Sequence, residues 1–109
     1  MQQLVSVIIP TFNRAHLLPR ALDSLLKQSY KNWEALVIDD ASTDDTKSVI
    51  ANYIKKDNRF HFYPLKENSG ACIARNVGIK NAKGTLVTFL DSDDEYLPQK
   101  IEKQVIDQF

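Results

Sequence analysis

The chain of 109 residues lacks several features that would assign it to a common protein class. Its only cysteine, Cys72, excludes a disulfide framework, and no spaced set of cysteines and histidines indicates a zinc site. Acidic and basic side chains number 14 each, so no net charge is available to bind a polyanion such as a nucleic acid. No apolar run approaches the roughly 20 residues of a membrane span, and the first residues do not resemble a signal peptide. These absences favour a single domain over residues 1–109 in the cytoplasm.

The sequence does contain a strict alternation of strand and helix patterns. Short apolar runs, rich in β-branched and aromatic residues, predict strands at 5–9, 33–38, 60–63 and 85–90. Apolar residues at three- and four-residue intervals predict helices at about 15–28, after 42–45, from 71 to near 83, and after Pro98. We expect Pro10 to end the first strand, the first and fourth strands to be buried, and the segment 42–45 to form a capping box.

This alternation predicts an α/β domain with an open, mostly parallel sheet and helices on both faces. Right-handed crossovers with one reversal after the third strand give the sheet order 3-2-1-4. The helical pattern is still running at Phe109 without a C-cap signal, so we expect the natural domain to extend further. Such a truncation would expose a sheet edge beside the fourth strand and an apolar face on the last helix, which predicts self-association.

Polar segments follow three of the predicted strands. Asp39 and Asp40 come after the second strand, the acidic run 91–94 comes after the fourth, and the segment 10–14 follows the first. Ligands of open α/β sheets bind outside the carboxyl ends of the strands. With strand one between strands two and four, these three segments are expected to border one crevice.

The spacing of Asp91 and Asp93 predicts a metal site. On an extended segment both carboxylates face the crevice, whereas Ser92 faces away. Two convergent carboxylates need a cation to stay ionised. Mg²⁺ or Mn²⁺ suits them, because these ions bind one or two carboxylates together with substrate phosphates and water.

The other polar segments are expected to contact the rest of such a ligand. Asp39 and Asp40 point to opposite sides, so one meets the ligand and the other orders the following loop. The chain has no glycine-rich phosphate loop. Charge neutralisation of a diphosphate therefore falls to the metal and to Arg14 or Arg75.

Four segments in order resemble the nucleotide-binding half of a family 2 glycosyltransferase with the GT-A fold. They read VSVIIPTFNR, QSYKNWEALVIDDASTDDT, NSGACIARNVGIKNAKG and LVTFLDSDDEYLP, and they span Val5 to about Pro98. The resemblance implies transfer of a sugar from a nucleotide-diphosphate donor, usually UDP-linked, with inversion at the anomeric carbon. Ala41 stands where the family commonly has glycine, which puts the shape of that loop in question.

The resemblance also implies roles for residues of the first two segments. Pro10, Thr11 and Phe12 match the part that packs around the base and ribose. Asp40 matches the aspartate that bonds the uracil, and Asp39 is the less certain member of the pair.

For the last two segments, the resemblance implies contacts with the diphosphate end of the donor. Asp91, Ser92 and Asp93 match the DXD motif, in which the first carboxylate approaches the ribose or sugar and the last binds the metal that bridges the phosphates. Arg75 and Asn76 match an ARN signature with a role in donor positioning.

The catalytic residue is not identified by this resemblance. The general base of these enzymes belongs to the acceptor-binding half, which we expect beyond Phe109. That half would bind a glycan or lipid-linked acceptor, so this part alone is expected to bind donor and metal with little or no transfer. The full-length protein is expected in the cytoplasm or at the cytoplasmic face of the membrane.

Three other classes of protein have related sequence patterns. The chain is compatible with a non-catalytic nucleotide-binding or assembly module. A phosphoacceptor receiver domain has similar size, but it needs its acidic pair after the first strand, where this chain has Pro-Thr-Phe-Asn. A nucleotidyltransferase would normally carry a glycine-rich loop after that strand.

Overall fold

The computed structural model describes residues 3–107, and its centre is a four-stranded parallel sheet. The strands lie in the order β3-β2-β1-β4, with every neighbouring pair parallel. They are β1 (Val5–Thr11), β2 (Trp33–Asp39), β3 (Phe60–Pro64) and β4 (Leu86–Phe89). The predicted parallel sheet and its order 3-2-1-4 are confirmed.

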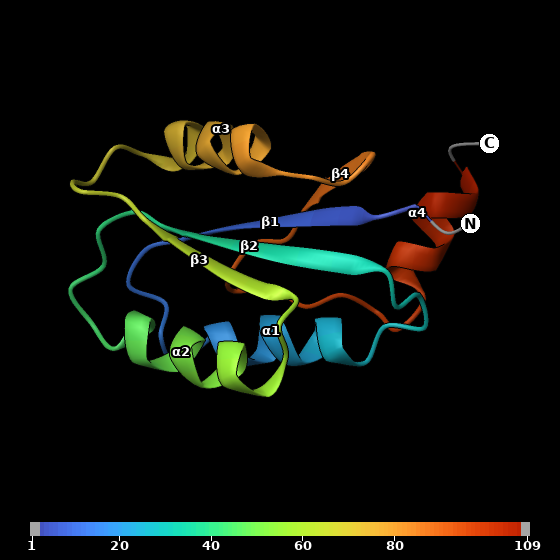
Figure 1. Cartoon of the computed structure of the whole chain (residues 1–109). Helices are drawn as coiled ribbons and strands as arrows, with labels where there is room; N and C mark the ends of the chain where they lie inside the picture. The colour runs from blue at the N-terminus through green and yellow to red at the C-terminus, as the bar shows by residue number, and fades with distance from the viewer. Residues whose placement is uncertain (1–2, 108–109) are drawn as a thin grey trace.

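Helices cover both faces of this sheet, as the alternating pattern predicts (Figure 1). Two of them, α1 (Leu18–Leu26) and α2 (Thr46–Lys56), lie on one face, and α3 (Ala71–Asn81) lies on the other. The last helix, α4 (Lys100–Asp107), lies beyond the end of the sheet at which β1 begins. The carboxyl ends of the strands are therefore left open at the opposite end.

Alternate residues of β1 contribute to two separate cores. Val7 and Ile9 belong to the cluster that includes Leu22 of α1, whereas Ile8 belongs to the cluster that includes Ala74 of α3. Side chains two apart on a strand share a face, so this division follows from the pleat. A strand that is apolar on both faces must lie inside the sheet, and β1 does.

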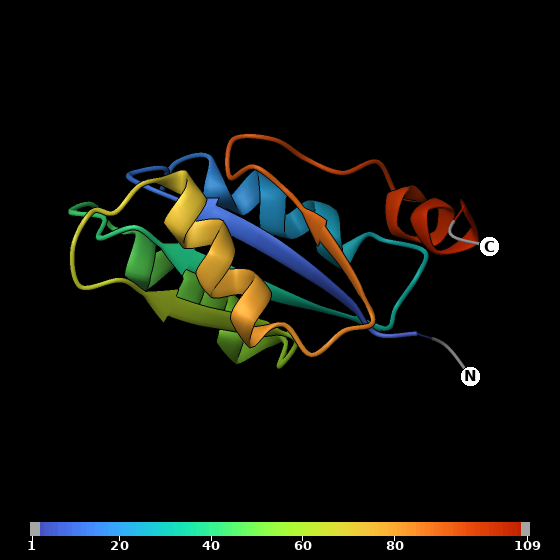
Figure 2. The same ribbon diagram turned by 90° about the horizontal axis from the view of Figure 1, so that it is seen from above.

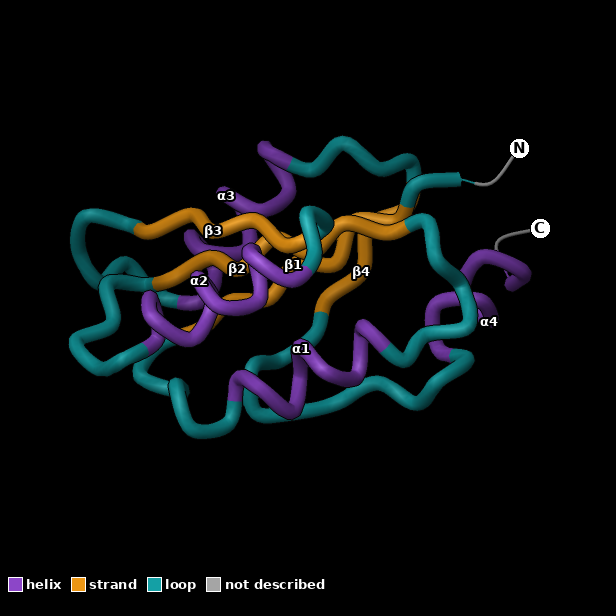
Figure 3. The backbone as a smooth tube through the Cα atoms, turned by 60° about the horizontal axis from the view of Figure 1, so that its bottom comes forward, coloured by secondary structure: helices purple, strands orange, loops and turns teal. Residues whose placement is uncertain are grey.

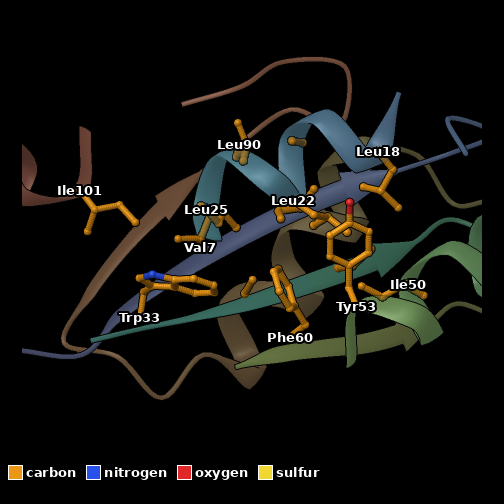
Figure 4. Packing of buried hydrophobic residues seen from close by; sticks show 14 of the residues in the cluster. Val7, Leu18, Leu22, Leu25, Trp33, Ile50, Tyr53, Phe60, Leu90 and Ile101 are labelled. Atoms are coloured by element: carbon orange, nitrogen blue, oxygen red, sulfur yellow. The ribbon is translucent and has the colours of Figure 1, made fainter. Parts of the chain in front are cut away.

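Aromatic rings fill the larger core, between the sheet and the helices α1 and α2 (Figure 4). Phe60 contacts Trp33 and Tyr53 edge to face, with ring centroids 5.4 and 5.6 Å apart. Tyr53 lies on α2, so these rings pack α2 against β2 and β3. This packing fixes the position of α2 relative to the sheet, and with it the loop that joins β2 to α2.

The first strand does not end before Pro10, contrary to the prediction. Pro10 and Thr11 continue the pairing with β2, and Asp40 donates its backbone N–H to the carbonyl of Thr11 at 2.9 Å. Alternate residues of a parallel strand bond to opposite neighbours. A residue at position 10 would direct its N–H toward β4, but the pairing of β1 with β4 ends at Ile8. The proline therefore breaks no ladder bond.

The fourth strand is shorter and more exposed than predicted. It spans four residues and forms an edge of the sheet, with β1 as its neighbour. Thr88 is buried, whereas the side chain of Phe89 is 43% exposed. Within the described part of the chain, no strand pairs with the outer edge of β4. The strand is therefore partly exposed although its residues are mostly apolar.

The segment after β4 runs back beside α1 to reach α4 (Figures 2 and 3). Ser24 of α1 accepts the backbone N–H of Tyr96 through its hydroxyl at 3.0 Å. The fully buried side chain of Gln28 donates to the carbonyl of Leu97 and accepts the N–H of Ile101. These hydrogen bonds hold the segment that follows the acidic residues 91–94 against α1 and Gln28. None of the helices within residues 3–107 has the length and apolar character needed to cross a membrane.

Candidate functional site

A cleft of about 420 Å³ opens at the carboxyl ends of β1, β2 and β4. All three polar segments contribute to it, together with the first turns of α3. Its lining consists of Pro10, Thr11, Phe12, Asn13, Arg14, Asp40, Ala71, Ala74, Arg75, Asp91, Ser92 and Asp93. The topology therefore brings nine residues of the three polar segments together with Ala71, Ala74 and Arg75 of α3.

The wall from β1 carries an unusual polar atom. The hydroxyl of Thr11 is buried, with the residue 3% exposed, and has no hydrogen-bond partner within the described residues. A buried hydroxyl without a partner is costly unless a ligand or water satisfies it. Beside it, Phe12 is 43% exposed at the rim. This wall offers the aromatic ring of Phe12 to a ligand, whereas the hydroxyl of Thr11 is enclosed behind it.

The wall from β2 is built around the carboxylate of Asp40, which is 6% exposed. Its two oxygens accept the backbone N–H groups of Ser69 and Gly70 at 2.7 and 3.0 Å. These amides precede α3, so the carboxylate ties the end of β2 to the start of that helix. Each oxygen retains a second lone pair with which to accept another hydrogen bond.

Asp39 lies outside the cleft, although it was predicted among the donor-binding residues. Its carboxylate is 6% exposed and accepts the backbone N–H of Ser42 at 3.1 Å. This bond closes a turn in which Ala41 has a φ of 64°, the left-handed region that favours glycine. The loop thus has the shape expected for glycine, with an alanine in it, and Asp39 orders that loop.

The acidic residues after β4 form a turn rather than an extended segment. Asp94 donates its backbone N–H to the carbonyl of Asp91 at 3.0 Å. The predicted alternation, with Ser92 facing away, is therefore wrong: all of 91–93 line the cleft, and Ser92 is the buried member. Arg20 of α1 donates to the backbone carbonyl of Asp93 and so holds the turn against the helix.

The carboxylates of Asp91 and Asp93 are exposed, and neither forms an ion pair or a side-chain hydrogen bond within residues 3–107. Such hard oxygen donors suit Mg²⁺ or Mn²⁺. No group of three or more histidine, cysteine or acidic side chains in this range is arranged to hold a metal. The donor set fits an ion that takes its remaining ligands from phosphates and water.

Two guanidinium groups complete the cleft. Arg14 follows β1, and Arg75 lies on the first turns of α3. Both are exposed, and neither forms an ion pair with any described residue. Asn76, the neighbour of Arg75, is exposed but is not part of the cleft lining.

Three lining residues were not among the predicted site residues. Ala71 and Ala74 lie on α3, where small side chains leave room for a ligand. In the sequence, the small residues Ala71 and Ala74 shortly before Arg75 were the feature that could have indicated this role. Asn13 has a φ of 51°, a conformation that asparagine tolerates better than most residues, so an asparagine directly after Thr-Phe was the available clue.

The predicted capping box at 42–45 is not formed. Asp44, rather than Ser42, accepts from the start of α2: its Oδ1 takes the N–H of Thr46 at 3.1 Å and the hydroxyl of Thr46 at 2.5 Å. The hydroxyl of Ser42 instead accepts the backbone N–H of Asn13 at 2.9 Å. The segment therefore serves the neighbouring loop as well as the helix.

A family model and sequence relatives of this chain point to glycosyltransferases. A family model described as Glycosyl transferase family 2 matches residues 6–106. TuaG of Bacillus subtilis, named as a teichuronic acid biosynthesis glycosyltransferase, is 45% identical over 94% of this chain and 40% of its own length. WfgD of Escherichia coli, named UDP-Glc:alpha-D-GlcNAc-diphosphoundecaprenol beta-1,3-glucosyltransferase, is 40% identical over the same shares.

Solved structures show the same fold. The 1–349 part of S. aureus TarS in complex with UDP has a TM-score of 0.87 and 37% identity, over 95% of this chain and 32% of that one. The mannosyltransferase PcManGT from Pyrobaculum calidifontis, in complex with GDP-Man and Mn²⁺, has a TM-score of 0.81 and 30% identity, over 88% and 29%. This chain spans two fifths or less of each of these four proteins. Because the family model covers nearly the whole chain and the sheet matches solved members, the chain belongs to glycosyl transferase family 2 and has the GT-A fold.

Proposed function

We propose that this domain binds a UDP-linked sugar together with a divalent metal, for transfer of the sugar to an acceptor hydroxyl with inversion. One arrangement carries the proposal: the exposed ring of Phe12 and the free carboxylates of Asp91 and Asp93 border a single cleft. One end of that cleft suits a nucleoside, and the other suits a metal-bound diphosphate. TarS, 37% identical, has been crystallised with UDP and with UDP-GlcNAc, which supports this choice of donor.

The nucleoside is proposed to lie against Pro10, Thr11 and Phe12. The exposed ring of Phe12 offers a face for stacking. Asp40 is proposed to accept the imide N–H of uracil through a lone pair that Ser69 and Gly70 leave free.

The diphosphate is proposed to lie between Arg75, Arg14 and the acidic turn. Asp93, assisted by Asp91, would hold Mn²⁺ or Mg²⁺, and PcManGT, whose structure contains Mn²⁺, supports a divalent ion here. When bound, the ion would act as a Lewis acid on the departing diphosphate. The two guanidinium groups offset phosphate charge from the other walls. Neither Asp39 nor Asn76 is assigned a donor contact.

The acceptor is proposed to be a glycan or a lipid-linked sugar, bound by parts of the protein outside this domain. The name of WfgD specifies a lipid diphosphate acceptor, which supports this class. A location in the cytoplasm or at the cytoplasmic face of the membrane is proposed with it. We assign no residue of this chain as the general base. Transfer activity therefore belongs to the proposal for the whole protein.

Binding of UDP by the 109-residue chain tests the donor proposal. Calorimetric titration with Mn²⁺ should give binding that EDTA weakens strongly and that Asp93→Asn removes. The matched control is Asp94→Asn, the same charge change one residue beyond the cleft lining. Absence of metal-dependent binding in a folded sample would refute the proposal, and binding by a full-length protein that never transfers sugar would favour the non-catalytic module.

Self-association is proposed through the outer side of β4. This surface combines the unpaired strand edge with the exposed side chains of Phe89 and Leu97, which line one groove. The same groove carries acidic residues at 94–95 and the lysines Lys100 and Lys103, so a two-fold arrangement would place acid opposite base. Light scattering should show a mass that rises with concentration and falls in Phe89→Ser. A monomer at every concentration would contradict the idea.

A further inference from the structure

Two loops beside the cleft are bonded to each other. One is the segment 12–17 between β1 and α1, and the other is the segment 40–45 between β2 and α2. The backbone N–H of Asn13 donates to the hydroxyl of Ser42 at 2.9 Å, and Asn13 Oδ1 accepts the N–H of Thr43 at 2.8 Å. The N–H of Ala15 donates to Asp44 Oδ2 at 3.1 Å. These three bonds join positions about 30 residues apart in the sequence.

The first loop contributes three residues to the lining of the cleft. Phe12 and Arg14 flank Asn13, whose φ of 51° turns the chain between them. A left-handed residue reverses the local chain direction, so the conformation of Asn13 decides where its two neighbours point. The bonds to Ser42 and Thr43 hold that conformation from both the backbone and the side chain of Asn13.

Asp44 links this loop to the start of α2. One carboxylate oxygen accepts from Ala15, and the other accepts from the N–H and hydroxyl of Thr46. Burial alone would raise the pKa of Asp44, but the hydrogen bonds from Thr46 and Ala15 outweigh it and lower the pKa. The carboxylate thus remains an acceptor on both sides at neutral pH. Asp44 itself is not part of the cleft lining.

We propose that Asn13 and Asp44 are positioning residues for the donor, acting through Phe12 and Arg14. The inference rests on the proposed function and adds to it. A loop that is held in its binding shape loses less freedom when ligand binds, and affinity rises accordingly. Loosening the loop is expected to weaken nucleotide binding about tenfold while leaving the sheet and its cores intact.

The variant Asp44→Asn separates the two links of the carboxylate. The single oxygen of the substituted side chain is expected to accept the two hydrogen bonds from Thr46. The amide NH₂ group then faces the N–H of Ala15, and two donors cannot bond to each other. The connection to the first loop is lost, and the connection to α2 remains. Asp45→Asn is the matched control, because Asp45 has the same charge beside the same helix and makes no side-chain capping bond.

A pair of substitutions at Asn13 tests the other link. Asn13→Gly permits the left-handed backbone but removes the acceptor for Thr43, whereas Asn13→Asp retains both. We expect Asn13→Gly to bind UDP about tenfold more weakly than the wild type and Asn13→Asp to restore binding. A purely structural role would instead lower the unfolding midpoint in parallel with affinity.

The test combines titration of UDP with Mn²⁺, urea unfolding and amide exchange of Asn13 and Ala15. The expected result is weaker binding and faster exchange in Asp44→Asn and Asn13→Gly, with unfolding midpoints that fall only slightly below that of Asp45→Asn. Unchanged affinity in these variants, while the wild type binds, overturns the inference and leaves the proposed function standing. If the wild type does not bind UDP, the proposed function fails, and the inference, which rests on it, is overturned with it whatever the exchange rates show.

Discussion

The two acidic segments of this domain look alike in the sequence but differ in the structure. After β2, the carboxylates of Asp39 and Asp40 are buried and accept backbone N–H groups of Ser42, Ser69 and Gly70. After β4, the carboxylates of Asp91 and Asp93 are exposed and accept no hydrogen bond from any described residue. The first pair shapes the cleft, and the second remains available to a cation. Hydrogen-bond occupancy, rather than acidity, separates the aspartates that order neighbouring loops from those whose oxygens are open to a cation.

The largest effect on stability is expected from Asp40→Ala. The substitution leaves two backbone N–H groups ahead of α3 without their acceptor, and bonds to a charged acceptor contribute roughly 1.5–3 kcal/mol each. We expect the free energy of unfolding to fall by about 3 kcal/mol. Urea unfolding measures it, with Asp91→Ala as the control, for which a change within about 0.5 kcal/mol is expected. Equal losses in both variants would remove the distinction between the two segments.

The effect of bound UDP and Mn²⁺ on stability tests the acidic segment after β4. UDP with Mn²⁺ at about 100 times the dissociation constant should raise the free energy of unfolding by about 2.7 kcal/mol. Mn²⁺ alone should have little effect, because two carboxylates leave most of its coordination to phosphates and water. The double variant with Asp91→Asn and Asp93→Asn should keep the stability of the apo protein and lose this increment. Stabilisation of that variant by the same mixture would argue against metal binding at the turn.

Much of the fold was predictable because it depends on local patterns. Periodicity identified the elements, and their strict alternation restricted the sheet to a few topologies, of which 3-2-1-4 is observed. The convergence of three polar segments followed from that order. Pro10 was misjudged because the side of the strand on which its missing N–H falls depends on where β4 stops, and no local pattern encodes that.

The details of the site depend on contacts between distant residues, and these were not predictable. Which of Asp39 and Asp40 faces the cleft is decided by amides at 69 and 70, about 30 positions further along the chain. The turn at Asp91 is closed by a local bond but is held by Arg20 from α1. The sequence therefore identified nine of the twelve residues that line the cleft, but not their hydrogen-bond partners.

A smaller effect is expected at Ala41, which lies directly after the first acidic pair. Its φ of 64° costs an L-residue about 1–2 kcal/mol, and glycine would recover this at an entropic cost of roughly 0.5–1 kcal/mol. Ala41→Gly should therefore stabilise the protein by about 0.5–1 kcal/mol in urea unfolding. Ala82→Gly is the control, because Ala82 has a φ of −66° and glycine there should destabilise. Destabilisation by Ala41→Gly would mean that the loop does not store this strain.

The smallest effect extends the comparison to Asp44, a carboxylate that is bonded like the first pair but lies at the surface. Its pKa is lowered in the folded protein, because hydrogen bonds from Thr46 and Ala15 outweigh the opposing effect of burial. A lowered folded-state pKa gives stability that is present above the unfolded value of 3.8 and is lost as the pH falls through the folded value. The difference in unfolding free energy between wild type and Asp44→Asn should therefore shrink as the pH is lowered from neutral through 3.8 and below. Asp45→Asn corrects for removing a negative charge at the same helix end. A difference that stays constant over this range would show that Asp44 is not engaged as the structure describes.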